Sequence, residues 1–527
     1  MSYNNYFNLS LEREQLQVKM SFYDLHIEDD GKVGLVQQLV ERMDLTALIG
    51  SYKKRGRRPA CNPVTMLQII IFCYSEGLFS CRAIEKACKY DLRLRLILAG
   101  QKPPDYASIN RFRQRLAPLA EDLLHQFLKM LIEDKQVDLS SIYIDGTKIE
   151  SFANRYSFVW KKSILRHQAK LSARVADYFN LPKETASQIL EDTLEESLKA
   201  LYKKAGEKEI VFVYGSGKRK TREQKEIEML QKWLDRFQKY KQQLDLLADR
   251  NAYSKTDPDA SFMRMKDDHM RNGQLKPAYN IQLASSGQFI IAAYASAHPN
   301  DMPTLIPFLS QVIPKYRGLI LRVVCDSGYE SIENYSFLAK ENIQAFIKPA
   351  NYDKSKTRKY KEDIGRRENM TYVSEGDYYI CTNGKRLLRQ KDYYKTRKSG
   401  HKERIQNYRC QECTNCPFTK SCNKYAKVAN PKSKGISFSP DFQHYREEAL
   451  ENLRSQLGIE ERINRSIQAE GMFSKLKDGL KYNRFRHKGL ESIVAEINLM
   501  AIAMNLNTLL SKIKKGCQGP IRYQKAV

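Results

Sequence analysis

The sequence predicts an α/β fold in which a mixed sheet is flanked by helices and preceded by an all-helical segment. Short runs of β-branched and aromatic residues, bounded by glycine or serine, predict strands in the centre of the chain. Apolar residues at helical spacing predict helices near both ends. The chain has 527 residues, of which 42% are hydrophobic, and single cores stop growing at roughly 250–300 residues. Several domains are therefore expected.

The balance of charges indicates a polyanionic partner. The chain holds 89 Lys and Arg against 61 Asp and Glu, a formal net charge of +28. Basic side chains that displace counterions from phosphates supply much of the affinity for nucleic acids, so a nucleic acid is the expected partner. A basic soluble protein without such a partner is the alternative. Because no run of about 18 uninterrupted apolar residues and no secretory signal occurs, we expect a cytoplasmic protein without a membrane partner.

Residues 1–125 are expected to form a helical DNA-binding domain that resembles a helix-turn-helix. Pro63 opens a strongly apolar helix. A basic turn precedes it and contains Lys53, Lys54, Arg57 and Arg58. A second helix is predicted from an N-cap at Ser108 to Leu116. This helix carries three arginines, Arg111, Arg113 and Arg115. A short basic helix after a turn fits the recognition helix of a helix-turn-helix, and an ordinary amphipathic helix with a solvated face is the alternative.

The central part is expected to alternate between strands and helices. One apolar strand ends at Asp145 and another at Asp326, and each is followed by a glycine turn. Between them, residues 160–250 contain few Gly or Pro and predict an insertion of two long helices, a helical hairpin. The runs AYNIQLASS and QFIIAAYAS predict a β-hairpin. A helix is expected over Met302–Tyr316, just after Asp301, which is interpreted as structural.

Residues 351–440 are expected to form a basic, loop-rich insertion, because 22 Lys and Arg outnumber nine Asp and Glu. A dense group of cysteines lies here, at Cys410, Cys413, Cys416 and Cys422, with Cys381 upstream. Four thiolates at this spacing can close a tetrahedral Zn²⁺ site. Three cysteines separated by two residues each also suit an iron–sulfur cluster, and free thiols are the third interpretation. The final five-residue gap favours zinc.

Three carboxylates are candidates for chemistry. Asp145 and Asp326 each close a buried strand, which is where ligands bind at the rim of a sheet. Two such strands side by side would bring both carboxylates within reach of one Mg²⁺. Glu470 lies on a predicted helix beside the apolar stripe, with Lys477 two turns further on. Taken singly, each acid has an ordinary explanation as a helix cap, a turn residue or part of a solvated charge face.

The order of strand with Asp145, strand with Asp326 and helix with Glu470 resembles the DDE triad of cut-and-paste transposases with an RNase H-like catalytic core. Longer segments resemble one branch of bacterial insertion-sequence transposases. They are YIDGTKIESFANRYSFVWKK, TDPDASFMRMKDDHMRNGQLKPAYNIQLA, CDSGYES, RSIQAEGMFSKLKDGLKYNRFRHKGL and the helical stretch from Arg58 to Leu116. Related transposases carry the pattern Y-x2-R-x3-E-x6-K around the third acid. Glu470 and Lys477 fit this pattern, but Ile463 and Ser466 occupy the tyrosine and arginine positions, and Arg465 lies one residue early.

The resemblance implies a function as well as a fold. It implies an RNase H-like core formed by residues 138–350 and 440–515. Two Mg²⁺ or Mn²⁺ ions would be held by Asp145, Asp326 and Glu470, and Arg465 and Lys477 would contact DNA. The expected activity is cleavage of DNA at the terminal inverted repeats and transfer of the freed strand into target DNA. A homodimer in the bacterial cytoplasm, associated with the nucleoid, is expected. A catalytically idle DNA-binding protein and a stand-alone RNase H-like endonuclease are the alternatives.

Overall fold

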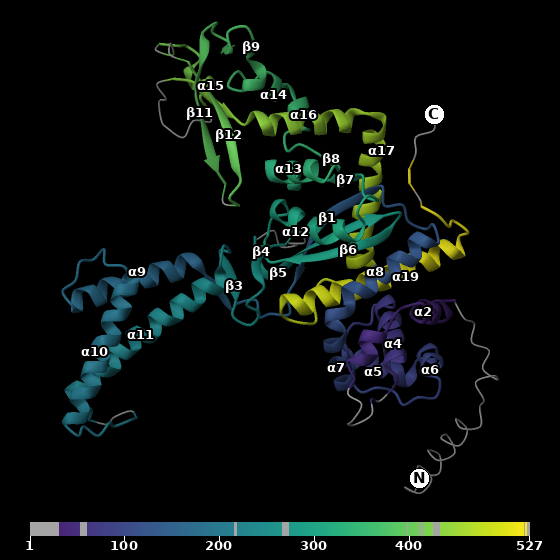
Figure 1. Cartoon of the computed structure of the whole chain (residues 1–527), viewed down its shortest axis with the longest axis horizontal. Coiled ribbons are helices and arrows are strands. Elements are labelled where there is room, and N and C mark those ends of the chain that lie inside the picture. Colours follow the sequence, from purple (N-terminus) through teal and green to yellow (C-terminus); the bar gives the residue numbers. More distant parts are fainter. Residues whose placement is uncertain are drawn as a thin grey trace, which may run out of the picture.

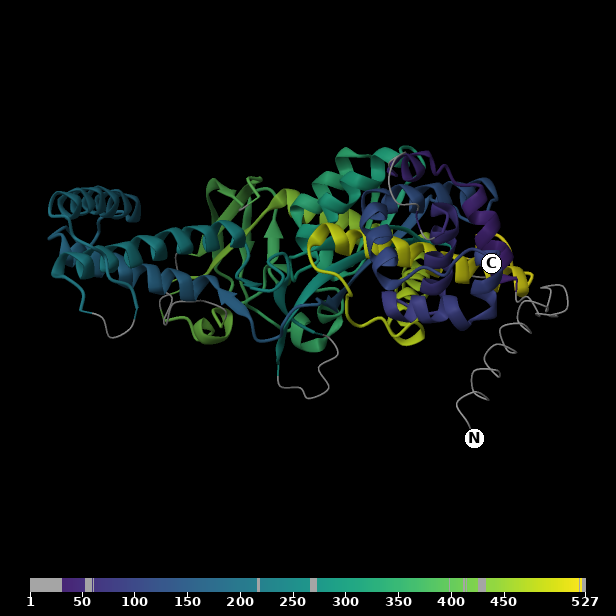
Figure 2. The same ribbon diagram turned by 90° about the horizontal axis from the view of Figure 1, so that it is seen from below.

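The computed structural model describes residues 31–52, 59, 61–215, 219–265, 273–397, 399–410, 413, 415–424, 433–520 and 522–523. Helices of the N-terminal part lie beneath a central sheet, and two further parts project from that sheet (Figure 1). One projection is an arm of helices, and the other contains a second sheet. Seen from below, the arm and the N-terminal helices lie at opposite ends of an elongated molecule (Figure 2).

The N-terminal part is helical, as the sequence predicts. Its helices are α2 (Lys32–Glu41), α3 (Thr46–Gly50), α4 (Pro63–Ser75), α5 (Cys81–Tyr90), α6 (Leu92–Leu98), α7 (Tyr106–Leu116), η1 (Ala117–Leu119) and α8 (Ala120–Glu133). Helix α4 begins where expected, because Asn62 accepts a hydrogen bond from the Val64 amide and Pro63 occupies the first helical position. Helix α7 is capped by Asp105 and not by Ser108, because the Asp105 carboxylate accepts the Ser108 amide at 2.6 Å.

The central sheet has six strands, β1 (Ser141–Glu150), β4 (Ser261–Arg264), β5 (Leu275–Ser286), β6 (Phe289–Ser296), β7 (Arg322–Cys325) and β8 (Gln344–Ile347). Strand β5 pairs antiparallel with β1, β4 and β6, and β1 pairs parallel with β7, which pairs parallel with β8. The predicted hairpin is confirmed as β5 and β6. Its turn at Gly287 and Gln288 has positive φ at both residues, which suits the right-handed twist of the strands.

The faces of the sheet are covered by helices α12 (Leu305–Val312), α13 (Ile332–Lys340), α16 (Pro440–Arg454), α17 (Gln456–Arg465) and α19 (Leu490–Lys514). The predicted helix over Met302–Tyr316 is present but divided, since 3₁₀ segments η2 (Met302–Thr304) and η3 (Ile313–Lys315) flank α12. On one face, Tyr143, Val324 and Phe346 form a row across β1, β7 and β8 and cluster with Leu453 of α16.

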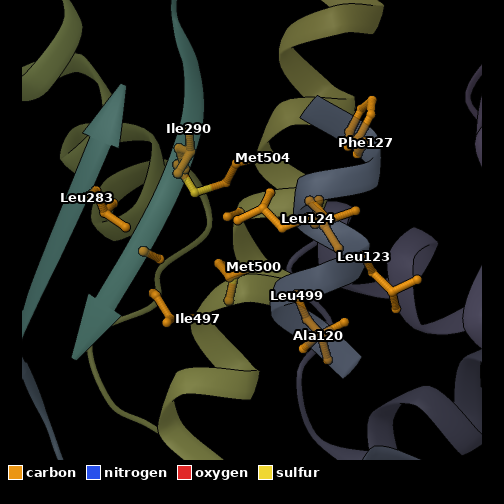
Figure 3. Close-up of a cluster of buried hydrophobic side chains, with 14 of the residues drawn as sticks. Ala120, Leu123, Leu124, Phe127, Leu283, Ile290, Ile497, Leu499, Met500 and Met504 are labelled. Atoms are coloured by element: carbon orange, nitrogen blue, oxygen red, sulfur yellow. The ribbon is translucent and has the colours of Figure 1, made fainter. Parts of the chain in front are cut away.

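Helix α19 joins the sheet to the N-terminal helices. Side chains from β5, β6, α19 and α8 interleave in one cluster that includes Ile290, Met504 and Leu124 (Figure 3). Helix α19 is long and apolar enough to cross a membrane by composition, with a mean hydropathy of 1.5 over its most apolar window. Because 83% of that window is buried within the protein, α19 is the helix at the centre of the core.

The arm contains three helices where the sequence predicted two. They are α9 (Lys161–Tyr178), α10 (Ser187–Glu207) and α11 (Arg222–Leu247). The additional break follows Asn180, which has a φ of 55°, and includes Pro182, which cannot donate a helical hydrogen bond. The three helices share a hydrophobic cluster of their own, and β2 (Phe158–Trp160) pairs with β3 (Ala252–Ser254) where the arm joins the sheet.

The basic insertion is more regular than the loop-rich prediction. It holds a five-stranded antiparallel sheet of β9 (Thr371–Val373), β10 (Tyr378–Ile380), β11 (Arg386–Thr396), β12 (Lys402–Cys410) and β13 (Gly435–Phe438). Short helical segments accompany it: η5 (Lys354–Lys356), α14 (Arg358–Lys361), η6 (Arg367–Asn369) and α15 (Thr419–Cys422). The strands were missed because basic residues replace the usual apolar alternation, and ten of the eleven residues of β11 are exposed or half-buried on a long projecting hairpin (Figure 1).

Candidate active site

Asp145 and Asp326 lie beside each other at one edge of the central sheet. Strands β1 and β7 run parallel, and Ile144 is the register partner of Cys325. The next residue on each strand is the aspartate, so both carboxylates leave the sheet at the same end. Burial raises the pKa of the Cys325 thiol, and the charges of Asp326 and Asp145 add to the rise. Both carboxylates therefore lie close enough to Cys325 to raise the pKa of its thiol.

Strand β1 continues past Asp145, where the sequence predicted a turn. The pairing of β1 with β7 stops at Ile144, but the pairing with β5 continues to Glu150. Asp145 thus lies within a strand at the point where its neighbour on one side ends. The pairing with β5 fixes the backbone of Asp145. Its half-buried side chain lies at the point where β7 no longer pairs with β1.

The side chain of Asp301 lies near Gly146 and Gly328, the glycines that follow Asp145 and Asp326 in the sequence. It accepts hydrogen bonds from Asn280 Nδ2 at 2.7 Å and Gln282 Nε2 at 2.9 Å. A Cβ atom at Gly146 would approach Asp301 Oδ1 and Gln282 Nε2 to 2.5 Å, so a larger residue after Asp145 would displace these two side chains. Asp326 caps the 3₁₀ segment η4 (Ser327–Tyr329) by accepting the Gly328 amide at 2.8 Å. Gly146, within strand β1, therefore leaves room for this polar network beside Asp145.

Arg465 connects Glu470 to this edge of the sheet. Its Nη1 lies 3.8 Å from Asp145 Oδ2, and its Nη2 lies 3.9 Å from Glu470 Oε1. The Glu470 side chain is 65% exposed and that of Asp145 is 15% exposed, so the site opens to solvent on the Glu470 side. Asp145 thus lies next to Asp326 on the sheet, and Arg465 stands between Asp145 and Glu470.

The helix that carries Glu470 contains a π-helical segment between Arg465 and Glu470. Helix α17 passes into η7 (Ser466–Glu470), then α18 (Gly471–Ser474) and a second π segment, η8 (Lys475–Gly479). A π turn closes with i→i+5 hydrogen bonds, so residues five apart lie on one side of the helix. The extra residue in the turn brings Arg465 beside Glu470 despite the displaced spacing. Lys477 is half-buried in η8, further along the same run.

Glu461 fixes this helix to the sheet and was missed by the sequence analysis. Its carboxylate accepts hydrogen bonds from Ser141 Oγ and Tyr143 OH of β1 and pairs with Arg322 Nε of β7 at 3.2 Å. Its side chain is only 3% exposed. Glu461 lies one helical turn before Arg465, so it sets where Arg465 and Glu470 meet the sheet. In the sequence it is one of two adjacent glutamates, and nothing local marks it as buried.

A basic pocket opens next to the acids and was also missed. Its lining includes Lys348 and Lys356 after β8 and Arg462 and Arg465 of α17. Tyr352 lies at its centre, because Lys356 Nζ stands 4.0 Å from its ring and Arg462 Nη1 donates to its hydroxyl at 3.0 Å. Basic residues around a half-buried aromatic ring are also found on surfaces that hold nucleic-acid backbones and bases. The run KPANYDKSK was the available signal.

Two parts of the chain match family models of transposases. Residues 380–510 match the transposase DDE domain, and residues 21–115 match a transposase domain (DUF772). The chain is similar to transposases over these two segments. No curated protein and no solved structure matches it significantly. The DDE domain implies an RNase H-like core and a DNA-processing enzyme, and its matched range contains Glu470 but not Asp145 or Asp326.

DDE transposases generally use divalent metal ions, and the donor set of this chain suits them. Carboxylate oxygens are the ligands that Mg²⁺ prefers, and it needs only one or two from the protein. Within the described ranges, no three Asp, Glu, His or Cys side chains are gathered as a metal site. The guanidinium of Arg465 instead lies between Asp145 and Glu470 and offsets their charge. Asp145, Asp326 and Glu470 are the residues that would hold the metal ions.

The three arginines of α7 differ in position. Arg111 and Arg115 are exposed, whereas Arg113 is 5% exposed. The Arg113 guanidinium donates to the Phe79 carbonyl oxygen and lies 5.0 Å from the ring of Tyr74. The prediction that Arg113 binds DNA is therefore corrected, because its side chain packs the N-terminal helices together. Lys53, Lys54, Arg57 and Arg58 lie outside the described residues.

We expect Arg113→Ala to destabilise the N-terminal part, and Arg111→Ala and Arg115→Ala to weaken DNA binding. Loss of Arg113 leaves a buried carbonyl without its donor, which costs about 1–3 kcal/mol. Loss of an exposed phosphate contact should reduce the salt dependence of binding by about one unit of slope. Thermal melting and DNA affinity at several salt concentrations measure both. An unchanged melting temperature for Arg113→Ala, with weakened DNA binding, would contradict this assignment.

Proposed function

We propose that the protein is an active transposase that cuts DNA at the ends of an insertion sequence and joins the freed ends to target DNA. Two observations support this most strongly: Asp145 and Asp326 follow register partners on adjacent parallel strands, and Arg465 stands between Asp145 and Glu470. The strand order adds support. Three antiparallel strands (β6, β5, β1) followed by two strands parallel to β1 (β7, β8) are the arrangement expected of an RNase H-like sheet.

In the proposed reaction, the oxygen of a water molecule attacks the phosphorus at the transposon end. The bond from phosphorus to the 3′ oxygen breaks, that oxygen takes up a proton to become the 3′-hydroxyl of the element, and the flanking DNA keeps the 5′-phosphate. The 3′-hydroxyl then loses its proton and attacks a phosphodiester of the target. A new bond joins the element's 3′ oxygen to that phosphorus, and the target's own bond from phosphorus to its 3′ oxygen breaks, which leaves a 3′-hydroxyl on the target. Two divalent ions held by the three carboxylates would stabilise the attacking and leaving oxygens. The basic pocket of Lys348, Lys356 and Arg462 would position the phosphates beside the acids. Lys477 would neutralise a further phosphate on the Glu470 side.

We further propose a division of labour along the chain. Residues 1–125 would recognise the terminal inverted repeats, and residues 138–350 and 440–515 would form the catalytic core. The arm within residues 160–250 and the basic insertion of residues 351–440 would hold DNA outside the catalytic site. Two ends must be held together before joining, so a homodimer on DNA is expected. The shared cluster of α19, α8 and β6 supports tight coupling between end recognition and catalysis.

The test uses linear DNA that carries the inverted repeats flanking the coding region, incubated with the full chain and Mg²⁺ or Mn²⁺. Cleavage at the repeat ends and joined products support the proposal. Binding to the repeats without cleavage indicates the idle DNA-binding protein. Cleavage without joined products indicates the stand-alone endonuclease. Activity that does not depend on the repeat sequence would contradict end recognition.

A further inference from the structure

Four of the five cysteines of the basic insertion line one small pocket. They are Cys381, Cys413, Cys416 and Cys422. Cys410, which the sequence analysis included, does not line this pocket. It ends β12 opposite Leu387 and lies 1% exposed in the cluster that fills one face of the five-stranded sheet. In the structure, Cys381 therefore replaces Cys410 in the predicted set of four cysteines.

We propose that Cys381, Cys413, Cys416 and Cys422 bind one Zn²⁺ ion. Zinc in structural sites is held by four ligands in a tetrahedron, and four cysteines are a common set. This proposal is independent of the proposed function, because it concerns a site in the second sheet, remote in the fold from the edge that carries the catalytic acids.

The backbone brings the four thiols together from three separate segments. Cys381 begins the tight turn between β10 and β11, in which the Gly384 amide donates to the Cys381 carbonyl at 2.9 Å. Cys413 and Cys416 share a turn in which the Cys416 amide donates to the Cys413 carbonyl at 3.3 Å. Cys422 ends the short helix α15. Hairpin turns and a short helix that each present one or two thiols match what a tetrahedral site needs.

Hydrogen-bond donors already point at two of these sulfurs. The Lys434 amide lies 3.2 Å from Cys413 Sγ, and Asn383 Nδ2 lies 3.6 Å from Cys416 Sγ. Donors of this kind orient metal ligands and tune the bound metal. A pocket of inert, packed thiols has no need of them.

Charge at the pocket favours a thiolate site. Four thiolates and one Zn²⁺ carry a net charge of −2. Lys434 is 8% exposed, and its ammonium donates to the Cys422 carbonyl at 2.9 Å and to the Gly365 carbonyl at 2.7 Å. A buried ammonium beside the cysteines offsets part of that negative charge. Such pairing is needed because moving an unpaired charge out of water costs free energy.

Metal binding would also stabilise a part of the chain that has little core. The cluster of the five-stranded sheet contains six buried residues, Met370, Tyr379, Leu387, Tyr408, Cys410 and Ile436. Within the described residues, no three Cys, His, Asp or Glu side chains already form a metal site. Binding must therefore draw the three segments together until each sulfur stands about 2.3 Å from the zinc ion. The free energy of zinc binding then adds to the free energy of unfolding of this sheet.

The experiment measures metal content by elemental analysis of the full chain purified without chelators. One zinc per chain is expected, together with a lower melting temperature after its removal. Cys381→Ser and Cys422→Ser should lower the zinc affinity by more than the roughly 10–100-fold that loss of an outer hydrogen bond costs. Cys410→Ala is the matched control, because it removes a thiol from the same insertion and should retain the zinc.

Several results would overturn the proposal. Wild-type protein that contains no zinc and binds none on titration excludes the site. Iron with acid-labile sulfide shows an iron–sulfur cluster in its place. Zinc retained in Cys381→Ser but lost in Cys410→Ala shows that the ligand set is wrong. Titration of the metal-stripped wild type with Co²⁺ remains informative if a variant fails to fold, since a tetrahedral thiolate spectrum supports the site and its absence opposes it.

Discussion

Asp145→Asn abolishes end cleavage and strand transfer, with an expected loss on the order of 10³-fold or more, as for a member of a catalytic unit. Asparagine has the size of aspartate but lacks the charge that would hold a metal ion. The β1–β5 ladder on both sides of residue 145 uses backbone groups alone, so the fold should be unaffected. The rate of cleavage at the repeat ends, at saturating Mg²⁺, measures the effect.

The three acids should behave as one unit in this measurement. Asp326→Asn and Glu470→Gln should each cause a comparable loss, and combining either with Asp145→Asn should add little. Binding to the repeat ends should persist or strengthen, because each substitution removes a negative charge from a surface that binds DNA. Asp249→Asn is the matched control, since Asp249 is a 73% exposed aspartate in the arm and pairs only with His298 among the ion pairs of the described residues. Cleavage that survives in Asp145→Asn would remove the proposed site.

Glu461→Ala should destabilise the catalytic core by about 3–5 kcal/mol, the usual cost of removing one partner of a buried ion pair. The substitution leaves Arg322, Tyr143 and Ser141 without their common acceptor. It also frees the start of the helix that carries Arg465 and Glu470. We therefore expect a lower melting temperature and a loss of cleavage that exceeds the loss of folded protein. Thermal melting and cleavage per folded molecule, measured below the melting temperature, test this.

Two comparisons show whether Glu461 acts through position. Glu461→Gln keeps an acceptor for the hydroxyl groups and should recover part of the stability and activity. Glu451→Ala removes an exposed glutamate from the neighbouring helix α16 and should resemble the wild type. If Glu461→Ala melts and cleaves like Glu451→Ala, the buried network does not position the third acid.

Local patterns predicted those elements whose cause is local. Helix α4 follows from Asn62, Pro63 and a run of apolar residues, and the β5–β6 hairpin follows from alternating strands around Gly287. The break after Asn180 and the strands around the cysteines were missed. A positive-φ asparagine carries a weak signal, and basic exposed strands lack the apolar alternation that predicts a strand. Such strands are stabilised by their ladder partners, which the sequence does not identify.

The sequence by itself determined the chemistry available to this protein: a net charge of +28, three acids at strand and helix positions, and a group of closely spaced cysteines. Only the tertiary structure decided which of these groups meet. It placed Asp145 beside Asp326, bridged Asp145 and Glu470 through Arg465, buried Arg113 and exchanged Cys410 for Cys381. The physical reason is that composition and periodicity describe neighbours along the chain, whereas a site depends on which faces of distant elements pack together.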